Sequence, residues 1–385
     1  MLMKNFLKLA LISLIALSCT KTEVRKQRYI EPDWAPTQSS NQKVIEIFAT
    51  NSLAGALTPQ QVYFSPEEIS PIKYGGASLL YAYNLVSKEK TKDTLWLDLG
   101  NAYDPLSGPV HLKTTGHFLK KMNYDAIAFT EKELAIIGTK NNAEKLPFII
   151  SNMIDLATGE TFSNESINPW KIIERDGVKI GIVSVTNYKF LKDNESSRVK
   201  GLFFEDIVLS ILRAKKHFAK NKVDFSILMA NIDSGCHSGH DKEFACPNQG
   251  DELKRLLERI PPETINLAFA SPNRIANGVI NNIPVVLVPG QGKWLSRVRV
   301  ILDSKEDLKN VEILDPIRVC DKVFHDTNDC HFPLSGEEDE SKRISLLKKS
   351  INEIKPAKFW GHEIIENIEI EEAFKAIRTQ GTQVP

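Results

Sequence analysis

The sequence has 385 residues, of which 42% are hydrophobic and 25% are charged, as is typical of a globular protein. Its 49 basic residues balance its 49 acidic residues, so no excess of positive charge indicates binding to nucleic acid or to an anionic membrane surface. This length allows one large domain of roughly 250–300 residues with extensions at its ends.

The N-terminal segment has the pattern of an export signal. Lysines precede an apolar run at residues 9–17, which is too short to span a bilayer. Cys19 follows directly after small residues, and this arrangement resembles a bacterial lipobox, in which residues 1–18 are removed and the cysteine thiol is acylated. A plain signal peptide with an incidental cysteine is the alternative. The lipobox implies a lipid-anchored protein of the bacterial cell envelope, and Thr20 favours the outer membrane, on its periplasmic or surface side.

The next segments predict a tether and then a layered domain. Residues 19–42 are polar, contain two prolines and show no hydrophobic periodicity, which predicts a flexible tether. From residue 43 onward, strands are predicted at 44–49, 94–99, 126–129, 147–152, 178–186, 224–230, 265–269, 285–288 and 297–302. Helices are predicted at 76–87, 110–122, 205–221 and 250–259. This alternation predicts an α/β architecture rather than an all-β sandwich.

Two local features complete the organisation of the chain. The dipeptide Asp176-Gly177 lies between two apolar runs and predicts a β-hairpin. After residue 305 the sequence changes, with a charged stretch at 336–343, a short amphipathic helix at 344–354 and a helix-prone stretch at 361–385. We therefore predict one domain at residues 43–305 and a C-terminal extension with short helices at residues 306–385.

Four further cysteines predict disulfides. They are Cys236, Cys246, Cys320 and Cys330, an even number in a chain with an export signal. The simplest assignment joins Cys236 to Cys246 and Cys320 to Cys330, although four cysteines allow three pairings. A zinc site is the alternative, because histidines lie near both pairs, but the C-x-x-C spacing of structural zinc sites does not occur.

Short polar turns follow several of the predicted strands. They end the segments 45–59, 94–101, 124–134, 224–233 and 267–273. In α/β proteins the active-site residues lie in such turns, at the carboxyl ends of the strands. Here the turns carry Ser, Ala, Asn and Lys where a site for hard metal ions would need Asp and His.

Blocks of sequence between residues 43 and 305 resemble the calcineurin-like metallophosphoesterases, in particular the bacterial periplasmic 5'-nucleotidase/UDP-sugar hydrolase branch. In the family's order, they are Gly75-Gly76 with TLWLDLGN at 94–101, NYDA at 123–126, DGVKIGIVSVT at 176–186, the loop and helix at 248–263, and PVVLVPGQGKWLSRVRV at 284–300. The resemblance implies a metallophosphoesterase-like β-sandwich flanked by helices, an αββα arrangement, as a single main domain.

The resemblance also implies where metal ligands would lie. The family holds two divalent ions with the motifs D-x-H, G-D, G-N-H-E, a lone H and G-H-x-H. On this chain the corresponding positions are Ser52, Ala54, Asn101, Glu131, Lys132, Glu133, Asn231, Ser271 and Asn273. Only Glu133 keeps the family's residue, and Ser, Ala and Asn do not supply the charge that holds two dications. We therefore expect no catalytic residue, no metal and no cofactor at these degenerate pocket positions.

The leading hypothesis is a pseudoenzyme with a binding or structural role in the envelope. It attaches to the membrane through the lipid on Cys19, has an unidentified protein partner and does not bind nucleic acid. Lys132 offers a cation for an anion or nucleotide ligand, and an ordinary solvated lysine is the alternative. Roughly 80 residues follow residue 302, and the resemblance implies that the family's second, nucleobase-binding domain needs more than that. Phe359 and Trp360 resemble one stacking element of that domain, although such a pair is more often a packing contact.

The alternative hypothesis is an active phosphoester or nucleotide hydrolase with a rebuilt metal site for manganese or zinc. Carboxylates for such a site would come from Asp98, Glu131, Glu133 and Asp233, with His237 and His240 near them in sequence. One bound ion is enough to activate a water molecule.

Overall fold

The computed structural model describes residues 42–63, 71–104, 106–139, 145–187, 201–238, 244–247, 251–272, 274–303, 308–325, 328–330 and 354–381. The predicted signal peptide, the lipidation site Cys19 and the predicted tether up to residue 41 therefore lie outside the described residues. Within the described residues, no helix has both the length and the apolar character needed to cross a membrane.

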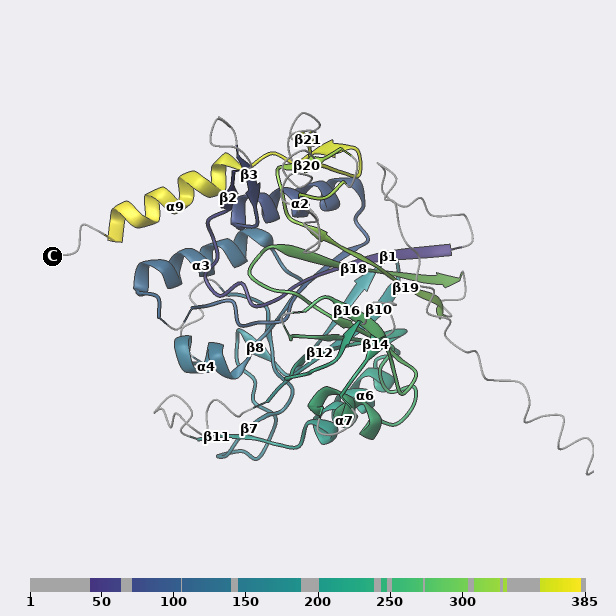
Figure 1. The fold of residues 1–385 in the computed structure, drawn as a ribbon. Helices are drawn as coiled ribbons and strands as arrows, with labels where there is room; N and C mark the ends of the chain where they lie inside the picture. Colours follow the sequence, from purple (N-terminus) through teal and green to yellow (C-terminus); the bar gives the residue numbers. More distant parts are fainter. Residues whose placement is uncertain are drawn as a thin grey trace, which may run out of the picture.

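Two β-sheets form the centre of the molecule (Figure 1). The first has seven strands in the order β19-β18-β1-β4-β5-β6-β8, and the strands from β1 to β8 are parallel to one another. Strands β18 and β19 extend this sheet in antiparallel fashion. The bounds are β1 (Gln42–Thr50), β4 (Thr94–Asp98), β5 (Ala126–Ala128), β6 (Phe148–Ile149), β8 (Ile167–Asn168), β18 (Trp294–Asp303) and β19 (Leu308–Arg318).

The second sheet has six strands in the order β16-β17-β15-β12-β10-β9. Its four inner strands are parallel to one another. Of the two outer strands, β9 forms an antiparallel hairpin with β10, and β16 forms one with β17. The bounds are β9 (Trp170–Arg175), β10 (Val178–Thr186), β12 (Phe225–Asn231), β15 (Leu267–Ala270), β16 (Ala276–Ile280) and β17 (Ile283–Leu287).

Alternating side chains of β10 show how the layers are built. Ile180 and Ile182 belong to the apolar core between the two sheets. Val183 and Val185 point the other way and pack in a second core beneath the helices. A strand that is covered on both faces needs apolar side chains on both, which explains why Val and Ile occur at even and at odd positions of β10.

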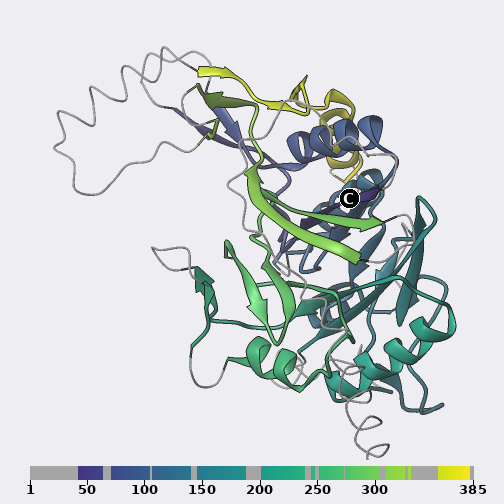
Figure 2. The ribbon, with the colours of Figure 1, turned by 90° about the vertical axis from the view of Figure 1, so that its right-hand side faces the viewer.

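Helices cover the outer face of each sheet (Figure 2). Those over the first sheet are α2 (Ala77–Lys90), α3 (Pro109–Met122), α4 (Glu131–Ile137) and α9 (Ile368–Gly381). Those over the second sheet are α6 (Ile207–Lys220) and α7 (Glu252–Arg259). The predicted α/β fold class, a helix-flanked β-sandwich in αββα order with a single main domain, is confirmed.

Short two-stranded sheets surround this sandwich. They pair β2 (Gln60–Val62) with β3 (Ile72–Tyr74), β7 (Met153–Asp155) with β11 (Leu202–Phe204), β13 (His237–Ser238) with β14 (Phe244–Ala245), β20 (Lys322–Phe324) with β21 (Ile354–Pro356), and β22 (Lys358–Phe359) with β23 (His362–Glu363). Both predicted disulfides are confirmed, because Cys236 is bonded to Cys246 and Cys320 to Cys330.

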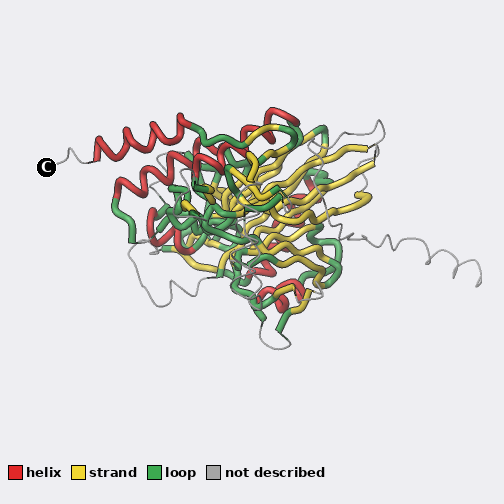
Figure 3. The backbone as a smooth tube through the Cα atoms, turned by 45° about the horizontal axis from the view of Figure 1, so that its top comes forward, coloured by secondary structure: helices red, strands yellow, loops and turns green. Residues whose placement is uncertain are grey.

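The C-terminal part of the chain packs into the core of the first sheet. Helix α9 lies beside α3 (Figure 3), and Phe374 on it is buried. Phe359 and Trp360 are also buried, and with Phe48 they surround the guanidinium of Arg297 at 5.6–5.8 Å from each ring centroid. The aromatic pair is therefore a packing element. The predicted domain boundary falls within residues 304–307, outside the described residues, and β19 beyond it belongs to the first sheet.

Candidate functional site

The loops that carry the predicted pocket positions meet at one edge of the sandwich. This edge lies at the carboxyl ends of the parallel strands, where β1 ends at Thr50, β4 at Asp98 and β12 at Asn231. The Asn231 side chain crosses between the sheets, because its Nδ2 donates a hydrogen bond of 3.2 Å to Leu99 O. The structure thus brings together loops that are far apart in the sequence, as the position of the turns predicted.

Backbone hydrogen bonds connect the loop after β1 to the loop after β4. Ser52 N donates to Gly100 O at 2.9 Å, and Ala54 N donates to Asn101 O at 3.1 Å. Ser52, Ala54 and Asn101 have φ values of 45°, 46° and 55°, in the left-handed region that non-glycine residues seldom adopt. Each such residue costs about 1–3 kcal/mol, and strained residues of this kind concentrate at functional sites. The loops therefore keep a special conformation at three of the expected ligand positions.

Neutral side chains fill this edge and bond to one another. Asn51 is 2% exposed, and its Nδ2 donates to Ser271 O and Val288 O, both at 2.8 Å. Ser52 Oγ donates to Asn51 Oδ1 at 3.0 Å, and Asn101 Nδ2 lies 3.5 Å from Ser52 Oγ. We call this set of amides and hydroxyls, together with Asn231, the neutral network. It joins the first sheet to the second without any charged group.

Glu133 keeps the residue type of the family motif, but its carboxylate accepts hydrogen bonds from backbone N–H groups. It is 0% exposed and forms a capping box with Thr130 at the start of α4. Its Oε1 accepts a hydrogen bond of 2.8 Å from Ala102 N, and its Oε2 accepts one of 3.2 Å from Thr130 N. Thr130 Oγ1 contacts Glu133 Oε2 and lies 3.0 Å from Asn101 Oδ1. The carboxylate is therefore occupied in fixing α4 and the loop after β4.

The neighbouring expected positions differ in their exposure. Lys132 lies in the first turn of α4 and is exposed, which agrees with the interpretation as a solvated lysine. Glu131 is half-buried in the same turn. Ala54 is exposed and carries no polar group. Asn273 lies outside the described residues.

Asp98 is a buried carboxyl group beneath the loop after β4. It is 1% exposed, accepts a hydrogen bond of 2.6 Å from Thr50 Oγ1 and one of 2.9 Å from Gly100 N. Burial is the main reason that the pKa of Asp98 rises from its ordinary value of 3.8 to about 7. The hydrogen bonds from Thr50 and Gly100 oppose the rise, and the Glu133 carboxylate adds to it. Burial, with the Asp98 charge as a smaller cause, also raises the pKa of Tyr124, whose hydroxyl lies 2.8 Å from Thr50 Oγ1.

A small cavity opens near the loop after β1. It has a volume of about 240 Å³ and is lined by Gly108, Pro109, Val110, His111 and Thr114 at the start of α3. The Nε2 of His111 lies 3.0 Å from Gly55 O.

Several residues that build this edge were not predicted. Thr130 was detectable, because Thr130 and Glu133 have the S/T-x-x-E spacing of a capping box. Asn51 and His111 gave no signal in the sequence, since their partners are backbone carbonyl groups of other loops.

The side chains of this edge do not match the donor set of a two-metal centre. Such a centre beside an anionic substrate needs several carboxylates and imidazoles close together. In the described part of the chain, the only group of three His, Cys, Asp or Glu donors within 4.8 Å of one another is Cys236, Cys246 and Asp251. Its two sulfur atoms are joined in a disulfide. The carboxylates of Asp98 and Glu133 do not belong to any such group, and the same holds for Glu131, Asp233 and His237, whereas His240 lies outside the described residues.

Comparison with known proteins identifies the fold. No model of a protein family matches the sequence, and no curated protein matches it significantly. Among solved structures, a 5'-nucleotidase precursor from Thermus thermophilus is similar with a TM-score of 0.56 and 16% identity, over 72% of this chain and 55% of that chain. The NAD nucleotidase of Haemophilus influenzae is similar with a TM-score of 0.59 and 15% identity, over 88% of this chain and 60% of that chain.

A third similar structure matches over nearly its full length. It is a calcineurin-like phosphoesterase from Bacillus subtilis, with a TM-score of 0.54 and 14% identity, over 88% of this chain and 98% of that chain. The matched region spans little more than half of the two nucleotidases. These similarities show that the chain has the fold that these two nucleotidases share with the calcineurin-like phosphoesterase, which is the fold that the sequence predicted.

Proposed function

We propose that this protein is a lipid-anchored component of the bacterial cell envelope whose metallophosphoesterase-like domain binds a partner or has a structural role instead of hydrolysing phosphoesters. One observation carries the proposal: Ser52, Asn101 and Asn231, three of the expected ligand positions, belong to the neutral network, in which Ser52 contacts both Asn51 and Asn101. Ser52 and Asn101, where the family has carboxylates, contact each other through neutral groups.

The electrostatics of the edge support this reading. Two dications and a phosphate need a high density of negative charge from the protein. The two fully buried carboxyl groups at this edge, Asp98 and Glu133, accept hydrogen bonds from the backbone of the loop after β4.

Two features bear on the partner and the location. Lys132 is exposed beside the neutral network and offers a cation to an anionic or nucleotide ligand. The lipobox-like sequence before Cys19 supports attachment to the membrane. Binding of a nucleotide or of inorganic phosphate that Lys132→Glu leaves unchanged would remove the anion part of the proposal.

The decisive experiment measures metal and activity together. Oxidised protein comprising residues 20–385 is incubated with manganese or zinc, separated from free metal and measured by elemental mass spectrometry, and the same sample is assayed with a phosphomonoester and with nucleotides. We expect less than one tenth of an equivalent of manganese and no turnover. One or two equivalents of manganese with turnover would instead establish the hydrolase with a rebuilt site, the activity that the similar structures favour.

A matched variant makes a negative result interpretable. Ser52→Asp with Ala54→His and Asn101→Asp places ligand types of the family on loops that already have the left-handed conformation. If this variant retains manganese and the parent does not, the assay detects metal binding and the loss lies in the side chains.

A further inference from the structure

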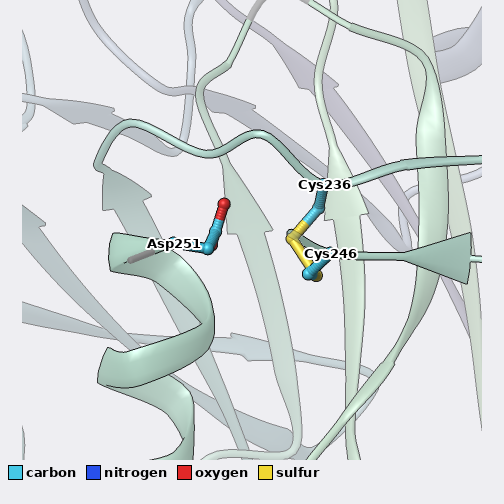
Figure 4. Close-up of side chains that lie close together, drawn as sticks. All are labelled: Cys236, Cys246 and Asp251. Carbon is cyan, nitrogen blue, oxygen red and sulfur yellow. A yellow bond between two sulfur atoms is a disulfide. The ribbon is translucent and has the colours of Figure 1, made fainter. Parts of the chain in front are cut away.

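The Cys236–Cys246 disulfide lies on the side of the second sheet, at the hairpin of β13 and β14. His237 pairs with Ala245 in this hairpin, so the flanking residues Cys236 and Cys246 face each other across its open end. Cys236 is 0% exposed, whereas Cys246 is half-buried. Figure 4 shows the disulfide beside the first turn of α7, with the Asp251 side chain next to it.

Asp251 is held in place by several donors. It is the N-cap of α7, and its Oδ1 accepts a hydrogen bond of 2.9 Å from Lys254 N. Its Oδ2 accepts one of 2.6 Å from Gly235 N, and Ser234 Oγ lies 3.0 Å from the same oxygen. The residue is 7% exposed. The carboxylate is therefore oriented by the surrounding backbone, as the outer shell of a metal site orients its ligands.

We propose that reduction of the Cys236–Cys246 disulfide converts this place into a site for a thiophilic divalent cation, in particular Zn²⁺. A dithiol reductant supplies two electrons and two protons, the S–S bond breaks, and the reductant leaves as its own disulfide. Zinc then displaces the thiol protons and binds the two thiolates and one Asp251 oxygen, with water at the fourth position. The proposal uses none of the residues on which the proposed function rests.

The geometry suits this ion. Zinc binds thiolate sulfur at about 2.3 Å and carboxylate oxygen at about 2.0–2.2 Å, so two sulfurs on one tetrahedral ion lie about 3.8 Å apart. The three donor atoms already lie within 4.8 Å of one another. Small side-chain rotations therefore suffice, and the metal would connect the hairpin to α7 much as the disulfide connects the two ends of the hairpin.

The other disulfide provides an internal comparison. Cys320 and Cys330 have the same separation of 10 residues in the sequence. Among the residues that the structure describes, no His, Asp or Glu completes a three-donor group with them. The inference is therefore specific to the cysteine pair beside Asp251.

The test uses residues 20–385 with both disulfides reduced by a dithiol, followed by removal of the reductant under argon. Zinc is added, free ion is removed and retained zinc is measured, while Co²⁺ in place of zinc reports thiolate ligation by its charge-transfer absorption. We expect about one equivalent of zinc in the reduced protein and less than a tenth in the oxidised protein. Cys320→Ser with Cys330→Ser should leave the retained zinc unchanged, and Cys236→Ser with Cys246→Ser should abolish it.

The variant Asp251→Asn separates ligation from folding. Asparagine caps a helix as well as aspartate does, so α7 should remain intact, which circular dichroism will check. Loss of the carboxylate ligand should weaken zinc binding by at least tenfold. The proposal is overturned if the reduced protein unfolds, if it retains no more zinc than the variant that lacks Cys236 and Cys246, or if Asp251→Asn binds zinc as tightly as the parent.

Discussion

The variant Asp98→Asn should be more stable than the parent at about pH 8 and nearly equal to it at about pH 4. The Asp98 carboxyl is 1% exposed, and its pKa is about 7 instead of the ordinary 3.8. An acid whose pKa is raised by folding binds its proton more tightly in the folded state than in the unfolded chain. The stability from this group is therefore complete below about pH 4 and is lost as the pH rises through about 7.

The size of the effect follows from the two pKa values. One pKa unit corresponds to about 1.4 kcal/mol, so the difference between 3.8 and about 7 corresponds to about 4 kcal/mol in the free energy of unfolding. Asparagine has nearly the same shape and no charge to bury. Its carbonyl would accept from Gly100 N, as Asp98 Oδ1 does at 2.9 Å, and its amide would donate to Thr50 Oγ1. Since a rearranged hydrogen bond costs about 1 kcal/mol, we expect a gain of about 2–4 kcal/mol at high pH.

Urea denaturation followed by circular dichroism, between about pH 4 and about pH 8, measures this difference. Asp104→Asn is the matched control, because a hydrogen bond from Leu106 N lowers the pKa of that half-buried carboxyl. Stability from a lowered pKa is present at high pH, so the control variant should gain nothing there. If the free energies of unfolding of Asp98→Asn and the parent run parallel across the pH range, the burial argument is wrong.

Other variants test the remaining parts of the edge. Glu133→Ala should lower the free energy of unfolding by about 2–3 kcal/mol in urea denaturation, because it removes the capping box and the acceptor of Ala102 N; a loss below about 0.5 kcal/mol would contradict this role. Ala54→Gly should raise it by about 0.5–1 kcal/mol, since glycine adopts the φ of 46° without strain, and a decrease would show that the loop is not strained. The variant with Ser52→Asp, Ala54→His and Asn101→Asp should retain several times more manganese than the parent, as elemental analysis can show, and no retention would mean that the loops do not hold the ligand geometry.

The sequence predicted the centre of the fold well because local signals and packing agree there. The apolar run of β10 is buried on both faces, and the Asp176-Gly177 turn that precedes it has φ values of 49° and 76°, as a tight hairpin requires. Strand β19 was missed, because its residues 308–318 mix charged residues with a proline. Its stability comes from pairing with β18, which is a tertiary interaction that local patterns do not contain.

The candidate site was predictable in position but not in its bonding. The turns after the strands indicated the edge, and the resemblance indicated the pocket positions. The bonds of Asn51, however, go to Ser271 O and Val288 O, which are 220 and 237 residues away in the sequence. Glu133 was an expected pocket position, and its bond to Thr130 N follows from the capping-box spacing, whereas only the structure shows that it also pairs with Ala102 N. The sequence therefore predicted which residue types lie at the edge, whereas most of their hydrogen-bond partners are known only from the structure.

The replacement of every expected ligand position except Glu133 has a physical reason. A site that lost its metals but kept most of its carboxylates would bury like charges without partners, at a cost of several kcal/mol. Amides and hydroxyls avoid this cost, because they pair with each other and with backbone carbonyl groups, as Asn51 and Asn231 do. The fully buried carboxyl groups of the edge fit the same rule: Glu133 is paired with backbone donors, and the raised pKa of Asp98 lets it take up a proton near neutral pH. Under the proposed loss of metal binding, the stability of the fold favours neutral side chains at the buried positions of this edge, and the neutral network has this composition.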